Sequence, residues 1–136
     1  MTRIFITGIT GQDGWYLTEA ALAAGHDVYG LIRGQNNPRE PELAEAFPAL
    51  HRLHGDLLDA SSVDHAVAEA RPDAIVNLGA VTFVPLSWEQ PELAVRVIVE
   101  GTLNVLNAAR RHSVGRVVQA STSEMFGNGK PRIEVT

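Results

Sequence analysis

Short apolar runs alternate with longer stretches of helical periodicity along this chain. The predicted strands lie at residues 3–7, 27–33, 50–55, 74–78 and 117–120, and most of them are apolar runs typical of buried strands. Helical patterns predict one helix that ends at Gly25, one that Ser61 and Ser62 cap and that reaches Ala70, and one over residues 92–112. Residues 35–48 predict a polar loop with one helical turn at 43–47. This alternation predicts a parallel sheet covered by helices on both faces.

Composition narrows the classes of function. At 136 residues the chain is the size of one domain, and its formal net charge of -5 gives no basic surface for nucleic acid. It has no cysteine, so disulfides and thiolate metal sites are excluded, and its five histidines lack ligand spacing, so we expect no metal. No apolar run approaches the roughly 20 residues that span a bilayer, and the first residues lack a signal-peptide pattern. We therefore expect a cytoplasmic protein without a membrane partner.

A glycine-rich stretch directly follows the first apolar run. Gly8, Gly11 and Gly14 have the spacing Gly-x-x-Gly-x-x-Gly at the junction between a predicted strand and a predicted helix. Glycines there let the backbone turn tightly and approach a pyrophosphate, which the amides of the following helical turn can bind. The remaining candidates for this phosphate cradle are Thr10, Gln12 and Asp13. On spacing alone, a simple glycine-rich turn remains an alternative.

Cofactor choice is expected to depend on the residue that ends the second strand. An acidic residue there would bind the ribose hydroxyls of NAD, but this chain has Arg33, about 20 residues after the glycines. A guanidinium suits the 2'-phosphate of NADP, so the sequence predicts NADP. The alternative is that Arg33 is an ordinary solvated charge.

The glycine stretch, residues 7–14, resembles the corresponding turn of GDP-mannose 4,6-dehydratases, members of the extended short-chain dehydrogenase/reductase superfamily. It has the sequence Thr-Gly-Ile-Thr-Gly-Gln-Asp-Gly. Residues 54–57 are similar to a family motif that implies adenine contact for Asp56 and a cofactor-binding position for Leu57. Residues 77–80 are similar to a motif that passes beneath the nicotinamide ribose. That motif adds the cofactor-binding candidates Leu78, Gly79 and Ala80.

Residues 119–127 carry the most specific resemblance, to the Gln-Ala-Ser-Thr-Ser-Glu-x-Tyr-Gly of the same family. The resemblance implies that Thr122 contacts the 4-hydroxyl of the sugar and that Glu124 removes the C5 proton. Related dTDP-glucose dehydratases have Asp in place of Ser123, and epimerases lack the Glu. Ser87 lies in a loop similar to one beside the family's sugar pocket. The alternative is that this hydroxyl-rich segment only caps a strand end.

The Tyr-x-x-x-Lys pair of short-chain dehydrogenases is absent from these 136 residues, whose only tyrosines are Tyr16 and Tyr29. In the family this pair would fall after residue 136, so we expect the amino-terminal part of a longer enzyme. Phe83 and Leu93 also differ from the residues that relatives have there. The loop after Arg33 is shorter than the family's, which puts the family's tetramer in doubt.

The expected fold is a Rossmann-like, doubly wound parallel sheet in α/β architecture, with strands 1 to 5 present and the later strands and the substrate domain missing. We treat residues 1–136 as one incomplete NADP-binding domain. The expected function is that of a nucleotide-sugar 4,6-dehydratase on GDP-mannose, homo-oligomeric at full length. The alternatives are an epimerase or reductase of the same superfamily, or a non-catalytic dinucleotide-binding module.

Overall fold

The computed structural model describes residues 1–122 of the chain. Five strands in this part form one parallel sheet in the order β3-β2-β1-β4-β5. The strands are β1 (Arg3–Thr7), β2 (Asp27–Ile32), β3 (His51–His54), β4 (Ala74–Asn77) and β5 (Arg116–Gln119). The helices are α1 (Gln12–Ala23), α2 (Glu40–Ala46), α3 (Ala60–Ala70), α4 (Val84–Glu89), α5 (Pro91–Val95), the π-helical η1 (Arg96–Glu100) and α6 (Gly101–Arg111).

The strand order defines a switch point beside β1. From β1 the chain builds outward through β2 to β3, then returns to add β4 and β5 on the other side. Connections that leave in opposite directions open a crevice at the carboxyl ends of β1 and β4, where doubly wound sheets bind ligands. The predicted Rossmann-like fold is therefore confirmed.

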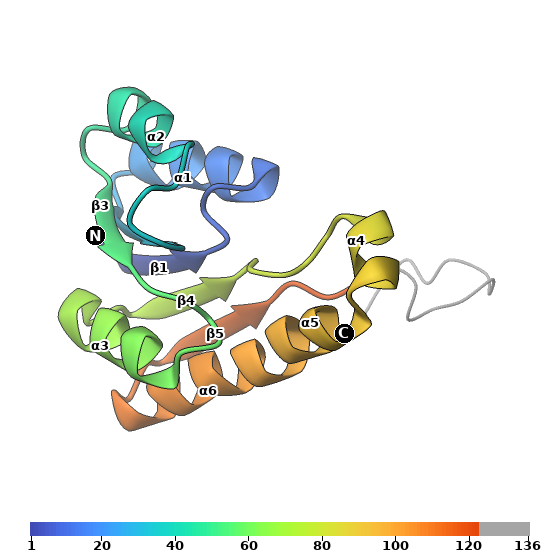
Figure 1. Ribbon diagram of the computed structural model, residues 1–136. Helices are drawn as coiled ribbons and strands as arrows, with labels where there is room; N and C mark the ends of the chain where they lie inside the picture. The colour runs from blue at the N-terminus through green and yellow to red at the C-terminus, as the bar shows by residue number, and fades with distance from the viewer. Residues whose placement is uncertain (123–136) are drawn as a thin grey trace, which may run out of the picture.

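Helices cover both faces of the sheet, with α1 and α2 on one side and α3 and α6 on the other (Figure 1). Successive side chains of β1 point to opposite faces, so Phe5 is buried against α3 and α6 and Ile6 against α1. Full burial of a side chain of this size contributes about 1.5–3 kcal/mol. This two-sided burial explains why the inner strands β1 and β2 are largely apolar.

The predicted loop at residues 35–48 contains a longer helix than the sequence indicated, α2. Pro41 lies in its first turn, where a missing amide does little harm. Leu43 and Phe47 are four positions apart and both buried, and the Phe47 ring meets Trp15 of α1 edge to face at 4.9 Å between centroids. Packing against α1 therefore stabilises a helix whose composition favours a loop.

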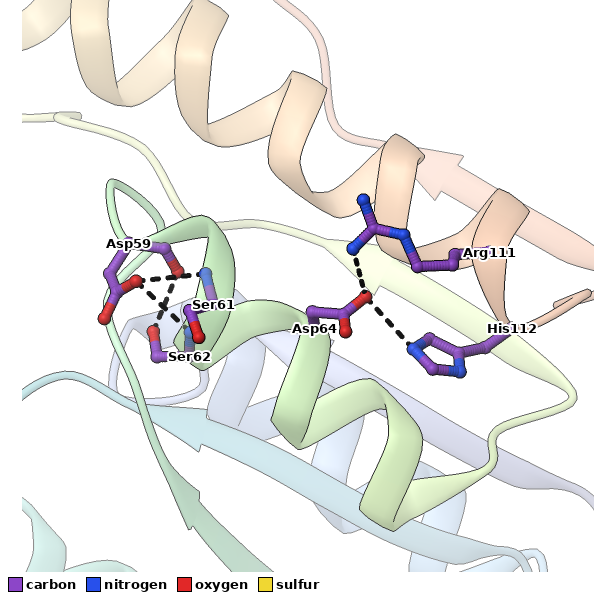
Figure 2. Close-up of polar contacts among 6 residues, drawn as sticks. All are labelled: Asp59, Ser61, Ser62, Asp64, Arg111 and His112. Carbon is purple, nitrogen blue, oxygen red and sulfur yellow. Dashed lines mark hydrogen bonds and ion pairs between the residues drawn. The ribbon is translucent and has the colours of Figure 1, made fainter.

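The cap of α3 differs from the prediction that Ser61 and Ser62 supply it. The helix begins earlier, and Asp59 caps it: its Oδ1 accepts hydrogen bonds from the amides of Ser61 at 3.0 Å and Ser62 at 3.3 Å (Figure 2). A carboxylate beside the amino end of a helix also interacts favourably with the helix dipole. The predicted end of α3 at Ala70 is confirmed.

An ion-pair cluster ties α3 to α6 on the surface. Asp64 Oδ1 accepts from Arg111 Nη1 at 2.8 Å and lies 3.1 Å from His112 Nε2 (Figure 2). Partial desolvation raises the pKa of Asp64, but the hydrogen bonds and charges of Arg111 and His112 together outweigh it and hold the pKa below its ordinary value.

The predicted helix over residues 92–112 is present but interrupted. The amide of Gly101 donates to the carbonyl of Arg96, five positions back, so η1 is a π-helical turn between α5 and α6. The preceding α4 forms where the sequence analysis expected a loop. None of the helices within residues 1–122 has the length and apolar character needed to cross a membrane.

Candidate functional site: a cleft at the switch point

The glycine stretch forms the turn between β1 and α1. The Gly11 amide donates to the carbonyl of Gly8 at 3.0 Å, which closes the turn, and α1 begins at the next residue. Within the described residues no side chain caps this end of α1. The amides of its first turn are therefore open to an anion, and phosphate binding there stays a prediction.

Two of the glycines are required by close backbone contacts. Gly8 has φ of +68°, and a Cβ on it would lie 2.8 Å from the Gly79 nitrogen after β4. A Cβ on Gly14 would lie 2.5 Å from the Gly8 carbonyl oxygen. The turn thus packs closely against both α1 and the end of β4, and a side chain at either glycine would force these backbone segments apart.

A buried polar chain joins the carboxyl ends of β1, β4 and β5. The Thr7 hydroxyl donates to Asn77 Oδ1 and accepts from the Gly79 amide at 3.0 Å. Asn77 Nδ2 donates to Gln119 Oε1 at 2.7 Å. Because Thr7 and Asn77 are fully buried, these bonds replace water and fix the relative positions of three strand ends.

A cleft of about 520 Å³ opens at this edge. Eleven of the twelve predicted cofactor-binding residues line it: Gly8, Thr10, Gly11, Gln12, Asp13, Gly14, Arg33, Leu57, Leu78, Gly79 and Ala80. These residues come from the ends of β1, β2, β3 and β4 and from the start of α1. The structure thus brings together segments that lie far apart in the sequence.

Asp56 is the predicted cofactor residue that does not line this cleft. Its Oδ1 accepts from the Leu58 amide at 2.9 Å, and its backbone bonds the Ser62 hydroxyl, so it shapes the turn before α3. Contact of Asp56 with adenine stays a prediction. Arg33 directly follows β2, is exposed and lines the cleft, and its contact with the ribose end of a dinucleotide stays a prediction.

Some lining residues were not predicted. Asn37 lines the cleft beside Arg33, and its position could have been suspected from an Asn-Pro turn so close to the end of β2. Thr82 follows the predicted motif at residues 77–80 by two positions. Val97 enters the cleft from the π-helical turn, which nothing in the sequence indicated.

A second cavity, of about 800 Å³, adjoins the first at Gly79, Ala80 and Thr82. Thr122, the predicted substrate-binding residue after β5, lines it. Glu124, the predicted base, lies outside the described residues. The second cavity also has walls from η1 and α6, which the sequence analysis did not include: Ile98, Val99, Thr102 and Leu103.

Ser87 lies in α4, where its hydroxyl donates to the Val84 carbonyl at 2.6 Å, and it lines neither cavity. Its substrate-side role stays a prediction. Across residues 1–122, histidine, aspartate and glutamate side chains form no group of three or more that could hold a metal ion.

Comparisons with known proteins agree with this geometry. GDP-mannose 4,6 dehydratase 1 of Arabidopsis thaliana is 42% identical over 139 residues, which cover 93% of this chain and 38% of the relative. WbmH of Bordetella bronchiseptica, solved in complex with NAD+, matches with a TM-score of 0.79 and 30% identity over 99% of this chain and 43% of that one. UDP-glucose 4-epimerase of Thermus thermophilus, solved with NAD, gives 0.78 and 31%, covering 88% of this chain and 37% of that one.

The sheet order, the glycine turn and the cleft at the switch point define a Rossmann-type protein of the epimerase/dehydratase class. Within this class the family model described as GDP-mannose 4,6 dehydratase matches residues 5–135. The chain belongs to the GDP-mannose 4,6-dehydratase family. It spans less than two fifths of the length of the Arabidopsis relative.

Proposed function

We propose that this chain is the cofactor-binding part of an NADP-dependent nucleotide-sugar 4,6-dehydratase that acts on GDP-mannose. The observation that carries the proposal is the convergence of the predicted cofactor residues on one cleft at the switch point of the sheet. A chance glycine-rich turn would not require the close approach of Gly8 to the end of β4. The solved relatives with bound NAD support a nicotinamide dinucleotide as the ligand.

The preference for NADP rests on Arg33. Arg33 lines the cleft, and its guanidinium carries five donors and no acceptor, so it suits a phosphate and not a ribose diol. Asn37, beside it in the wall, is uncharged and would tolerate the additional phosphate. No carboxylate follows β2 until Glu40, which is engaged with His54 at 3.0 Å and Arg52 at 3.8 Å.

In this proposal the first cavity binds the cofactor and the second binds the sugar. NADP, when bound, would supply the acceptor and later the donor of one hydride. In the second cavity the Thr122 hydroxyl would bind and orient the 4-hydroxyl of the sugar. Glu124 would accept the C5 proton, which is acidic once C4 is a ketone, and would assist the loss of the C6 hydroxyl as water. The phenol that deprotonates the 4-hydroxyl is not supplied by these 136 residues.

A nucleotide-sugar epimerase of the same superfamily is the second candidate, favoured by the likeness to UDP-glucose 4-epimerase. Glu124 separates the two proposals, because epimerases of this superfamily lack that glutamate. We further propose that the full-length enzyme is cytoplasmic and homo-oligomeric. Exposed apolar side chains of α5 and α6 that line neither cavity support self-association: Val95 and Leu106.

The decisive experiment uses the full-length enzyme with GDP-mannose and NADP. Glu124→Gln keeps the size of the side chain but cannot accept a proton, so this variant should still reduce NADP and should lose both elimination and deuterium exchange at C5. Thr122→Val should slow the earlier reduction of NADP. Glu19→Gln, an exposed position on α1 outside both cavities, is the matched control. Exchange at C5 at the parent rate in Glu124→Gln would contradict the assignment.

A further inference from the structure

Arg39 reaches the glycine turn from outside the cleft. It directly precedes α2, and its Nη1 donates to the carbonyl of Thr10 at 2.7 Å, across 29 positions of sequence. Thr10 lines the cleft, whereas Arg39 does not. The contact therefore acts on the back of the turn that receives the ligand.

With this contact, both polar groups of the peptide between Thr10 and Gly11 are hydrogen-bonded. The amide of the Thr10–Gly11 peptide donates to the Gly8 carbonyl at 3.0 Å, and its carbonyl accepts from Arg39. The next carbonyl, of Gly11, accepts from the amide of Trp15 at 3.1 Å. With these groups held, the orientation of the following amides at the start of α1 is set before any ligand arrives.

Arg39 is itself held in place by a ring contact, an ion pair and a backbone hydrogen bond. Its guanidinium carbon lies 5.9 Å from the centroid of the Trp15 ring, and its Nε lies 3.5 Å from Glu42 Oε2. Its backbone amide donates to Asn37 Oδ1 at 3.0 Å, and Asn37 Nδ2 donates to the Arg33 carbonyl at 3.4 Å. The loop that carries Arg33 is thus bound to the Arg39 backbone, which a change of the Arg39 side chain leaves in place.

We infer that Arg39 is a positioning residue that holds the pyrophosphate-binding turn in its binding conformation. The inference rests on the proposed function, since it assumes a dinucleotide in the cleft. Its consequence is specific, because the pyrophosphate is common to NAD and NADP. Loss of the hydrogen bond from Arg39 to the Thr10 carbonyl should weaken the binding of both dinucleotides by the same factor, about tenfold for one charge-assisted hydrogen bond. A direct contact with the 2'-phosphate would weaken NADP alone.

The test compares the parent chain with Arg39→Gln, and with Arg52→Gln as control. Arg52 is a neighbouring cation that contacts Glu40 and lies outside the cleft, so its removal changes the charge but spares the turn. Calorimetric titration with NAD+ and with NADP+ should show an equal loss, about tenfold, in Arg39→Gln only. Hydrogen exchange measured without ligand should be faster at the Gly11 amide and unchanged at Phe5 in the central strand β1, which separates a local release from global unfolding.

An unchanged affinity of Arg39→Gln for NAD would overturn the inference, and so would an equal loss in Arg52→Gln. Unchanged exchange at Gly11 would also overturn it. If the parent chain binds neither dinucleotide, the proposed function fails instead, and the exchange of the Gly11 amide alone then decides whether Arg39 holds the turn.

Discussion

Replacing Gly14 with alanine should destabilise the fold, although alanine is the better helix former. Gly14 lies in the first turn of α1 and is buried. A Cβ at this position would lie 2.5 Å from the Gly8 oxygen and 2.6 Å from the Cα of Ile9, where ordinary contact begins at 3.4 Å. Both neighbours are backbone atoms of the glycine turn, so relief of the overlap requires movement of the turn itself.

The size of the effect follows from two opposing terms. Overpacking of a core costs about 1–3 kcal/mol, and the upper end applies where the obstructing atoms are backbone. The higher helix propensity of alanine compared with glycine stabilises a helix by about 1 kcal/mol. The free energy of unfolding of Gly14→Ala should therefore fall by about 2 kcal/mol, which lowers the melting temperature of a domain of this size by roughly 5–10 °C.

Urea unfolding followed by circular dichroism measures this difference, with Gly25→Ala as a matched control. Gly25 lies two residues after the end of α1 with φ of +79°, and among residues 1–122 no atom other than its own and those of its chain neighbours lies within 4 Å of the position of its Cβ. Gly25→Ala should lower the free energy of unfolding by only about 1–2 kcal/mol, the cost of placing alanine in the left-handed backbone conformation. It should bind dinucleotide like the parent. Gly14→Ala should lose binding as well as stability. A Gly14→Ala variant as stable as the parent would refute the close approach of α1 to the turn.

Two further predictions concern acid stability and turnover. Because the pKa of Asp64 is lowered in the folded state, the ionised carboxylate stabilises the fold at pH values above 3.8, and this stabilisation is lost as pH falls through the pKa of the folded state. The difference in unfolding free energy between the parent and Asp64→Asn should therefore be present at pH 6 and shrink below pH 3.8 in acid titrations of unfolding. A difference that persists at the lowest pH would contradict this. The 136-residue chain, which lacks Tyr-x-x-x-Lys, should form no 4-keto-6-deoxy product from GDP-mannose and NADP, and any cofactor-dependent product would show that the base is misplaced.

The sequence predicted the strands and the cradle because both depend on local chemistry. Buried strands such as Arg3–Thr7 must be apolar on both faces, and the turn after them must contain glycine where backbones meet. Arg33, Leu57 and Gly79 line one cleft because each follows a strand, and the carboxyl ends of parallel strands lie at the same edge of the sheet.

The features that sequence reasoning missed depend on tertiary contacts. Helix α2 owes its stability to the burial of Leu43 and Phe47 against α1, which a polar, proline-containing stretch does not reveal. Asp59 caps α3 because the helix begins at Ala60, before the two serines that were expected to cap it. Val97 lines the cleft from a π-helical turn, and periodicity at 3.6 residues per turn does not predict such a turn.

The central claim is that the cleft binds NADP and that Arg33 selects it, and calorimetric titration of NADP+ and NAD+ into the full-length enzyme tests it most directly. The parent should bind NADP about tenfold or more tightly than NAD, as expected for charge-assisted hydrogen bonds to one phosphate. Arg33→Asp should reverse the order, and Arg110→Asp, the same change at an exposed site near the end of α6, should not. Equal affinities in the parent, or a preference for NAD, would contradict the account.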